Sequence, residues 1–130
     1  MSAIVNVEGH SELCRYNGSG GLEVLSSFNE GGFIFSRAVR DLTAFDDILF
    51  MVASTFTTGE EPYWYDGTSK PRLLVDFAPG ISSTEASILL SAHLQLFVLN
   101  QTPGSNLFNL YRIRARNSSS IVPNAPEPIE

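Results

Sequence analysis

The sequence is poor in the residues from which disulfides and many metal sites are built. Its 130 residues include one cysteine, Cys14, so no disulfide can close within the chain and no cysteine zinc site can form. The two histidines are His10 and His93. His10 and Cys14 supply only two of the four ligands that a structural zinc ion needs, and His93 adjoins an apolar segment where a structural histidine is expected. We therefore predict no metal and no cofactor.

Long apolar runs and positive charges are scarce as well. No segment approaches the roughly 20 apolar residues of a membrane span, and Met1–His10 lacks the basic and apolar regions of a signal peptide. The net charge of −6 argues against a nucleic-acid partner, because phosphate binding requires a basic surface. The sequence thus predicts a protein that neither inserts into a membrane nor coats nucleic acid.

Lysine is nearly missing from the sequence. Lys70 is the one lysine among eight basic residues, and the others are arginines. Arginine favours paired contacts at interfaces, because its planar, weakly hydrated guanidinium group forks onto carboxylates. The bias indicates buried or intersubunit ion pairs; a compositional bias of the genome is the alternative.

What the sequence does contain is apolar and aromatic residues in short runs. A hydrophobic fraction of 43% with 17% charged residues is typical of a folded domain, and 130 residues suit one core. Ile48–Phe56 begins with a continuous apolar run, which predicts a central strand covered on both faces. Strand-like segments recur about every ten residues, so we predict an all-β fold, an antiparallel β-sandwich or jelly roll.

Two hairpins are marked by glycine next to asparagine or aspartate, residues that tolerate positive φ. They are predicted at Asn17–Gly21 and at Asp66-Gly67. Pro62 and Pro71 are expected outside the strands or at their starts, where a missing amide donor is tolerated. Besides Ile48–Phe56, the predicted strands are Ala3–Glu8, Leu13–Tyr16, Leu22–Phe28, Phe33–Phe35, Tyr63–Tyr65, Arg72–Phe77, Ala92–Asn100 and Asn106–Ala115.

Two segments depart from this strand pattern. Ser82–Glu85 has the form of a capping box, which predicts one short helix near 83–90; direct entry into the strand Ala92–Asn100 is the alternative. After a β-sandwich domain over 1–116, residues 117–130 are rich in serine and proline and have few groups that could fill a core. We predict an extended C-terminal arm there, docked on a neighbouring subunit in an assembly; a disordered tail is the alternative for an isolated chain.

Arginine alternates with apolar residues in the last predicted strand. Because successive side chains of a strand point to opposite faces, the arginines share one face. Neighbouring cations repel one another unless they are paired. We interpret the row as part of a subunit boundary, with Asp41, Asp46 or Asp47 as the paired acids; a solvated outer face is the alternative. The arginines are Arg112, Arg114 and Arg116, alternating with Tyr111, Ile113 and Ala115.

A cluster of aromatic residues precedes the second predicted turn. Tyr63, Trp64, Tyr65 and Asp66 combine rings that stack on sugar faces with a carboxylate that accepts hydrogen bonds from sugar hydroxyls. This combination predicts an exposed contact for a glycan or a protein partner. Alternating aromatic residues are also good strand and core residues, so a purely structural role is the alternative.

Two pairs of adjacent acids, Asp46-Asp47 and Glu60-Glu61, are the candidates for general acid and base chemistry. Neighbouring side chains of a strand point to opposite faces, so neither pair converges on one bond. We expect solvated or salt-bridged carboxylates instead, and we predict that the chain is not an enzyme.

The segment Arg40–Phe50, with the sequence RDLTAFDDILF, resembles a pattern in small β domains of tailed-phage fibres and related virion proteins. In that pattern a leucine and then a Phe-Asp pair lead directly into an apolar strand. The strands Leu94–Asn100 and Leu110–Ala115 follow in a similar relative order. The sequence departs from the fibre proteins in having no long fibrous or coiled-coil stem, which favours a separate small virion component.

The resemblance implies a non-enzymatic bacteriophage structural protein, either a capsid decoration protein or a fibre-knob subunit. Such proteins are β-sandwich or jelly-roll subunits that commonly form homotrimers. The implied partners are further copies of the chain, other virion proteins and a host surface glycan, and the implied location is the virion, after synthesis in the host cytoplasm. No catalytic residue can be carried over from the matched segments. The alternative function is a carbohydrate-binding module centred on Tyr63, Trp64, Tyr65 and Asp66.

Overall fold

The fold is that of a computed structural model, which describes residues 2–7, 10–16, 19–26, 39–55, 59–67, 71–75, 77, 87–88, 95–101, 106–117 and 120–129. Every regular element among these residues is a β-strand. The strands are β1 (Ser2–Val7), β2 (His10–Tyr16), β3 (Leu22–Ser26), β4 (Val39–Phe45), β5 (Ile48–Thr55), β6 (Gly59–Tyr65), β7 (Arg72–Leu73), β8 (Ser87–Ile88), β9 (Gln95–Gln101), β10 (Phe108–Arg114) and β11 (Glu127–Pro128). This described part contains no helix long and apolar enough to cross a membrane.

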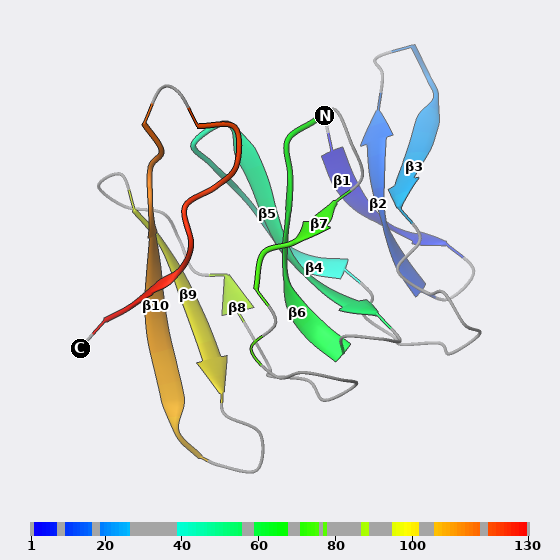
Figure 1. The fold of residues 1–130 in the computed structure, drawn as a ribbon. Coiled ribbons are helices and arrows are strands. Elements are labelled where there is room, and N and C mark those ends of the chain that lie inside the picture. Colours follow the sequence, from blue (N-terminus) through cyan, green and yellow to red (C-terminus); the bar gives the residue numbers. More distant parts are fainter. Residues whose placement is uncertain are drawn as a thin grey trace.

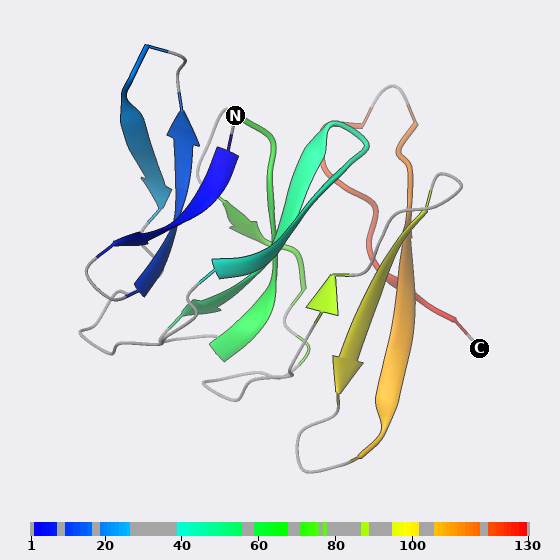
Figure 2. The ribbon, with the colours of Figure 1, turned by 180° about the vertical axis from the view of Figure 1, so that it is seen from behind.

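The strands form three antiparallel sheets. The N-terminal sheet has the order β1-β2-β3, the central sheet β4-β5-β6-β7, and the C-terminal sheet β11-β10-β9-β8. Figure 1 shows the central sheet between the other two, and the view from behind in Figure 2 shows the same arrangement. The prediction of an all-β antiparallel sandwich is confirmed.

Strand β5 lies in the middle of the central sheet, between β4 and β6. Its side chains alternate between two hydrophobic clusters: Phe50 and Val52 enter the first, and Met51 and Ala53 enter the second. Phe50 and Met51 are both fully buried although they point to opposite faces. The prediction of a strand covered on both faces is therefore confirmed.

The first cluster joins the central sheet to the C-terminal sheet. Trp64 packs there beside Ile48, Phe50 and Val52, and the C-terminal sheet supplies the other side. The Phe77 ring closes the edge of the cluster against Tyr111, with ring centroids 4.8 Å apart. The residues from the C-terminal sheet are Ile88, Leu96, Val98 and Ile113.

The second cluster covers the opposite face of the central sheet, on the side of the N-terminal sheet. It contains Val39, Met51, Ala53, Tyr63 and Tyr65. Arg15 of β2 links the two sheets: its Nη1 donates to the Tyr65 hydroxyl at 3.5 Å and to the carbonyl of Gly67 at 3.3 Å. The central sheet thus has buried side chains on each face.

Tight turns explain how the strands connect. The predicted hairpins are confirmed: β2 pairs with β3 around Asn17–Gly21, and β6 pairs with β7 after Asp66-Gly67, where Gly67 has a φ of 95°. A further hairpin was not predicted. Asp46 and Asp47 form a two-residue turn between β4 and β5, with φ values of 55° and 58°. Two successive residues with positive φ are the signature of a type I′ turn, whose twist matches that of paired strands.

A third aspartate with positive φ bends strand β4. The register between β4 and β5 shifts between Arg40 and Thr43, so that Asp41 and Leu42 face a single residue of β5. Asp41 has a φ of 60°, as the first residue of a G1-type β-bulge does. Aspartate takes this conformation at lower cost than most residues, because its short side chain bonds locally.

The position of Pro62 differs from the prediction. It lies inside β6, opposite Val52 of β5, rather than outside a strand. Its carbonyl accepts a hydrogen bond from the amide of Leu74 at 2.9 Å, so the donor that proline lacks faces the β7 side and not β5. Proline is tolerated there because β7 is only two residues long and ends just before Leu74.

Two other predictions lie partly or wholly outside the described residues. The short helix near 83–90 is wrong at Ser87–Ile88, which form β8 against Val98 and Leu99 of β9; the rest of that range lies outside the described residues. The predicted strand Phe33–Phe35 also lies outside them.

Candidate functional site

The arginine row lies on the outer face of the C-terminal sheet. In β10, Ile113 points into the core and is buried, whereas the side chain of Arg114 is half exposed. Arg112 Nε and Arg114 Nε both donate to Glu127 Oε2, at 3.4 and 3.3 Å. The two arginines therefore share one face of the strand, as their spacing predicts, and their acid belongs to the same chain.

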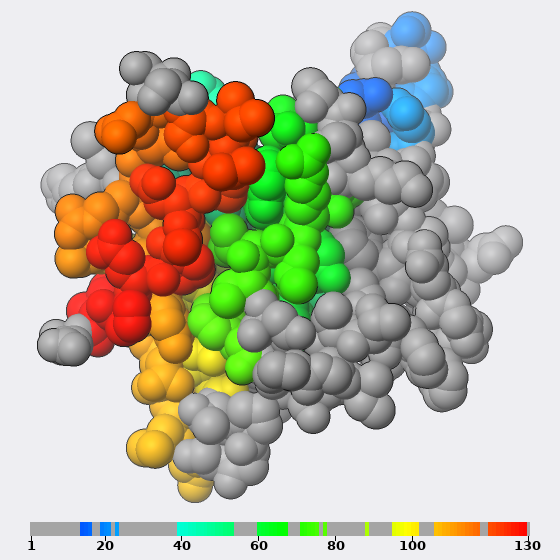
Figure 3. All heavy atoms as spheres, in the orientation of Figure 1, coloured from blue at the N-terminus to red at the C-terminus, as the bar shows by residue number. Residues whose placement is uncertain are grey.

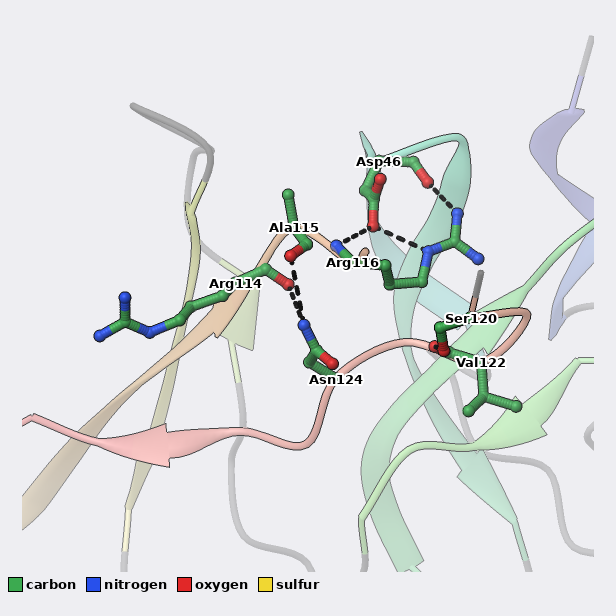
Figure 4. Close-up of polar contacts among 7 residues, drawn as sticks. All are labelled: Asp46, Arg114, Ala115, Arg116, Ser120, Val122 and Asn124. Carbon is green, nitrogen blue, oxygen red and sulfur yellow. Dashed lines mark hydrogen bonds and ion pairs between the residues drawn. The ribbon is translucent and has the colours of Figure 1, made fainter. Parts of the chain in front are cut away.

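Arg116 is held by the turn between β4 and β5, in an arrangement that we call the Asp46–Arg116 clamp. Asp46 Oδ2 accepts hydrogen bonds from the backbone amide and from Nε of Arg116, both at 2.8 Å. Arg116 Nη2 also donates to the Asp46 carbonyl at 2.5 Å (Figure 4). Both side chains are mostly shielded from solvent, with 16% of Arg116 and 23% of Asp46 exposed. The clamp connects the central sheet to the end of β10.

The electrostatics of the clamp favour the charged form of Asp46. Partial burial is the largest single influence, and it raises the pKa of this carboxyl group. The backbone hydrogen bond, the side-chain hydrogen bond and the charge of Arg116 act in the opposite direction, and together they outweigh the burial. The pKa of Asp46 therefore lies below its ordinary value, and the carboxylate stabilises the fold when ionised.

Other acids are also paired within the chain. Arg40 Nη1 donates to Asp41 Oδ2 at 2.8 Å, and Arg40 Nη2 bonds to Glu60. Glu61 is fully buried, and its Oε2 accepts a hydrogen bond from the backbone amide of Phe77 at 3.1 Å. Asp41 and Asp46, which were expected to meet the arginine row across a subunit boundary, thus have arginine partners in their own chain. The prediction that adjacent acids do not converge holds for Glu60 and Glu61, which have separate partners.

Within the C-terminal arm, the structure describes Asn117 and Ser120–Ile129, and the latter segment returns to its own domain. Asn124 Nδ2 donates to the carbonyls of Arg114 and Ala115, at 3.0 and 3.2 Å (Figure 4). Two register pairs then join β11 to β10, and the Ile129 amide donates to the Leu110 carbonyl at 2.9 Å. Figure 3 shows this segment on the surface of the molecule, beside β10. The arm therefore completes the C-terminal sheet as an edge strand.

The hydrogen-bond register explains why prolines suit this edge. Ile129 bonds to Leu110, and bonded pairs alternate along an antiparallel ladder, so Glu127 is the next bonded residue. Pro126 and Pro128 fall at the alternate positions, where the backbone nitrogen points away from β10. The missing donors lie on the free side of β11, where they discourage the addition of another strand.

Apolar side chains are exposed along β10 and the arm. Phe108 is 60% exposed, and Leu110 and Ile129 lie next to it on the outer face of the sheet. Leu99 faces the same side, because it is the register partner of Leu110. We call Leu99, Phe108, Leu110 and Ile129 the outer apolar patch. Further exposed apolar residues nearby in the chain are Leu107, Ile121 and Val122.

The aromatic cluster is not exposed, which corrects the prediction of a stacking surface. Tyr63, Trp64 and Tyr65 are 7%, 6% and 5% exposed. Strand β6 is an inner strand, so its alternating rings fill the clusters on both faces of the central sheet. Arg72 covers the Trp64 ring, with its guanidinium carbon 5.1 Å from the ring centroid. The alternative, a purely structural role as strand and core residues, therefore applies to all three rings.

Sequence reasoning missed the acid and the amide that hold the arm. Glu127 lies between two prolines, a composition that predicts an extended tail and hides its position opposite Arg112. Asn124 carries no signal beyond its neighbouring proline. The alternation of proline with other residues over Pro126–Pro128 was the available clue, because it suits an edge strand.

The outer apolar patch, flanked by Arg112, Arg114 and Glu127, is the surface on which a functional interpretation can be built. No family model, curated protein or solved structure matches the chain. Function is therefore inferred from this surface and from the sequence resemblance alone.

Proposed function

We propose that this chain is a non-enzymatic structural subunit of a bacteriophage particle, a capsid decoration or fibre-knob protein that acts by associating with copies of itself. The resemblance of Arg40–Phe50 to small β domains of phage virion proteins supports the particle role. The antiparallel sandwich is compatible with it, because such sandwiches serve as building blocks in many assemblies. A cyclic homotrimer is the assembly that the resemblance implies.

The observation that carries the proposal is the outer apolar patch. The inner face of the C-terminal sheet packs against the central sheet, so the apolar residues on that inner face belong to the core. Phe108, Leu110 and Ile129 lie on the outer face and are not among the residues of that core. Contiguous exposed apolar side chains with polar neighbours mark protein–protein contacts, because covering them removes apolar surface from water.

The charges next to the patch favour one relative orientation of the two copies in such a contact. Arg112 and Arg114 share the single carboxylate of Glu127, so one positive charge remains in excess at this place. The whole chain has a net charge of −6. A local cation on an acidic protein attracts an acidic region of a neighbouring copy, which helps to fix the relative orientation of the two.

The self-association is tested by the mass of the purified chain in sedimentation equilibrium. A trimer has three times the monomer mass of 14.2 kDa, about 43 kDa. Phe108→Glu places a charge in the outer apolar patch and is expected to shift the population to monomer. Tyr16→Glu is the matched control, because Tyr16 is 42% exposed on β2, away from the patch. A monomeric wild-type chain, or equal loss of mass in both variants, contradicts the proposal.

Membership of the particle needs a separate test. Antibodies raised against the folded chain are expected to label purified particles of the encoding phage in immunogold electron microscopy. Labelling on the head supports a decoration protein, and labelling on the tail supports a fibre knob. Particles that bind no antibody, while the free chain does, contradict the virion role.

A further inference from the structure

We propose that the C-terminal arm is exchanged between copies, so that Glu127–Ile129 of one chain pair with β10 of a neighbour. This proposal rests on the self-association in the proposed function, and arm exchange is the mechanism by which the copies would hold one another. The recognition site is the edge of β10 beside Leu110 and Arg112, and the occupant is the arm of a second copy. Within one chain the same edge is filled by the chain's own arm.

The intrachain contacts of the arm are few and solvent-accessible. Strand β11 has two register pairs with β10, and one additional backbone bond follows at Ile129. Asn124 adds two side-chain bonds, to the carbonyls of Arg114 and Ala115. The ion pairs of Glu127 are 3.3 and 3.4 Å long, and its side chain is 45% exposed, so solvent screens them. Release of the arm therefore costs little free energy compared with unpacking either hydrophobic cluster.

Exchange restores every contact that release removes. A neighbour's Glu127 meets the same Arg112 and Arg114, and its Ile129 meets the same Leu110, because the two copies are identical. The balance between the closed and exchanged forms is then decided by surfaces that only the assembly covers. These surfaces are apolar in the chain that links β10 to β11: Ile121 is 81% exposed and Val122 is 47% exposed.

The outer apolar patch gives a second reason for a neighbouring copy. Ile129 belongs to the arm, whereas Phe108 and Leu110 belong to the strand that the arm joins. An exchanged arm carries its own chain towards the neighbour's patch, which places an apolar surface of each copy near that of the other. The patch and the exposed residues of the link are then covered by the same event.

The Asp46–Arg116 clamp and the prolines define the exchanging segment. The clamp fixes the chain at Arg116 to its own central sheet, so the segment that moves begins after that residue. Pro126 and Pro128 limit the conformations of the released arm and so reduce the entropy lost on docking. Because both prolines lack donors on the free edge of β11, an exchanged arm ends the sheet and discourages the addition of a further strand.

The test uses a cross-strand disulfide between different chains. Arg112 and Glu127 are register partners in a hydrogen-bonded pair, a geometry with a Cα separation of about 5.5 Å that a disulfide can bridge. In a Cys14→Ala background, a tagged Arg112→Cys chain is co-expressed with an untagged Glu127→Cys chain and oxidised. We expect a covalent heterodimer of tagged and untagged chains on a non-reducing gel, and its loss on reduction.

Two controls keep the outcome interpretable. The double variant Arg112→Cys/Glu127→Cys in one chain reports whether this pair can bridge at all. Asn109→Cys with Glu127→Cys is the mismatched pair, because Asn109 lies on β10 at a position that does not face Glu127. Exchange is overturned if the double variant bridges within single chains while the mixed chains give no more heterodimer than the mismatched pair. If the arms stay within their own chains although the protein is multimeric, only the exchange proposal is wrong. If the protein is monomeric, the proposed self-association is wrong as well.

Discussion

Strands β5 and β10 are similar in length and both carry large apolar side chains, yet they serve different purposes. In β5 both faces are buried, with Phe50 on one side and Met51 on the other. In β10 Ile113 is buried while Phe108, on the opposite face, is 60% exposed. The difference follows from position: within the part of the chain that the structure describes, β5 has a sheet on each side, and β10 packs against the central sheet with its inner face only (Figure 1). Apolar residues therefore stabilise the fold in β5, whereas those on the outer face of β10 are available for association.

The largest effect expected from this comparison is at Phe50. Replacing Phe50 by alanine removes a fully buried ring from the first cluster and leaves a cavity between the two four-stranded sheets. We expect a loss of about 3–5 kcal/mol in the free energy of unfolding. Chemical denaturation followed by the emission of Trp64, which packs in the same cluster, measures the change.

Phe108→Ala is the matched substitution on the exposed face. We expect it to change the unfolding free energy of the monomer by no more than about 0.5 kcal/mol, because the ring has little to lose in packing. Its effect should appear in the association constant instead. Similar losses of monomer stability for both phenylalanines would break the comparison between the two strands.

The next largest effect is expected where the two sheets are connected by charge. Arg116→Ala removes two of the three hydrogen bonds of the Asp46–Arg116 clamp and leaves the backbone amide in place. We expect a loss of about 1–2 kcal/mol, because charge-assisted bonds that are mostly shielded from water contribute that much. Thermal and chemical unfolding of the variant measure it.

Arg114→Ala provides the control for an arginine on the open face. Its bond to Glu127 is 3.3 Å long, and half of the Arg114 side chain is exposed. We expect a change below about 0.5 kcal/mol, as is typical of exposed ion pairs. A ranking in which Arg114 contributes more than Arg116 would show that the clamp does not join the sheets as described.

The same clamp predicts a pH dependence. The pKa of Asp46 is lower in the folded chain than its ordinary value of 3.8, so the folded state binds this proton less readily than the unfolded state. The stabilisation is complete above the ordinary value and is lost as the pH falls through the lower, folded value. The stability gap between wild type and Asp46→Asn should therefore be constant near neutrality and narrow below 3.8. A gap that widens on acidification would contradict the sign of the shift.

The sequence predicts the parts of the fold that depend on local pattern. The apolar run of β5 and the glycine-containing hairpins were identified correctly, because burial on both faces and positive φ each leave a direct mark in the sequence. Pro62 and the rings of β6 were misplaced for a different reason. Pro62 is tolerated inside β6 because its partner strand β7 has only two residues, and Tyr63 and Trp64 are buried because β6 is an inner strand. Both features depend on strands that are not adjacent to these residues in the sequence.

The candidate site was predicted in its components and not in its connections. Alternation placed Arg112 and Arg114 on one face, but it could not identify Glu127 as their acid, since that pairing depends on the chain turning back after Arg116. The pairing of Arg116 with Asp46 was anticipated as a contact between subunits and occurs within one chain. Charge complementarity selects suitable partners, and only the topology decides whether they belong to the same copy.

The last predicted effect, smaller than those at Phe50 and Arg116, concerns the turn that joins β4 to β5, where the central sheet meets the clamp. Asp47 is exposed and has a φ of 58°, in the second position of the type I′ turn. Glycine takes this conformation without a steric cost, and Asp-Gly is a preferred pair for the turn, whereas alanine has no side-chain bond to offset the strain. We expect Asp47→Gly to raise the unfolding free energy by about 0.5 kcal/mol and Asp47→Ala to lower it by about 1 kcal/mol.

Asp47→Asn separates charge from conformation, because asparagine tolerates positive φ and carries no charge. Denaturation midpoints in the order glycine, aspartate, alanine support a backbone origin. Equal midpoints for glycine and alanine, both uncharged, would assign the effect to the lost charge, and the turn would then place no demand on the residue at this position.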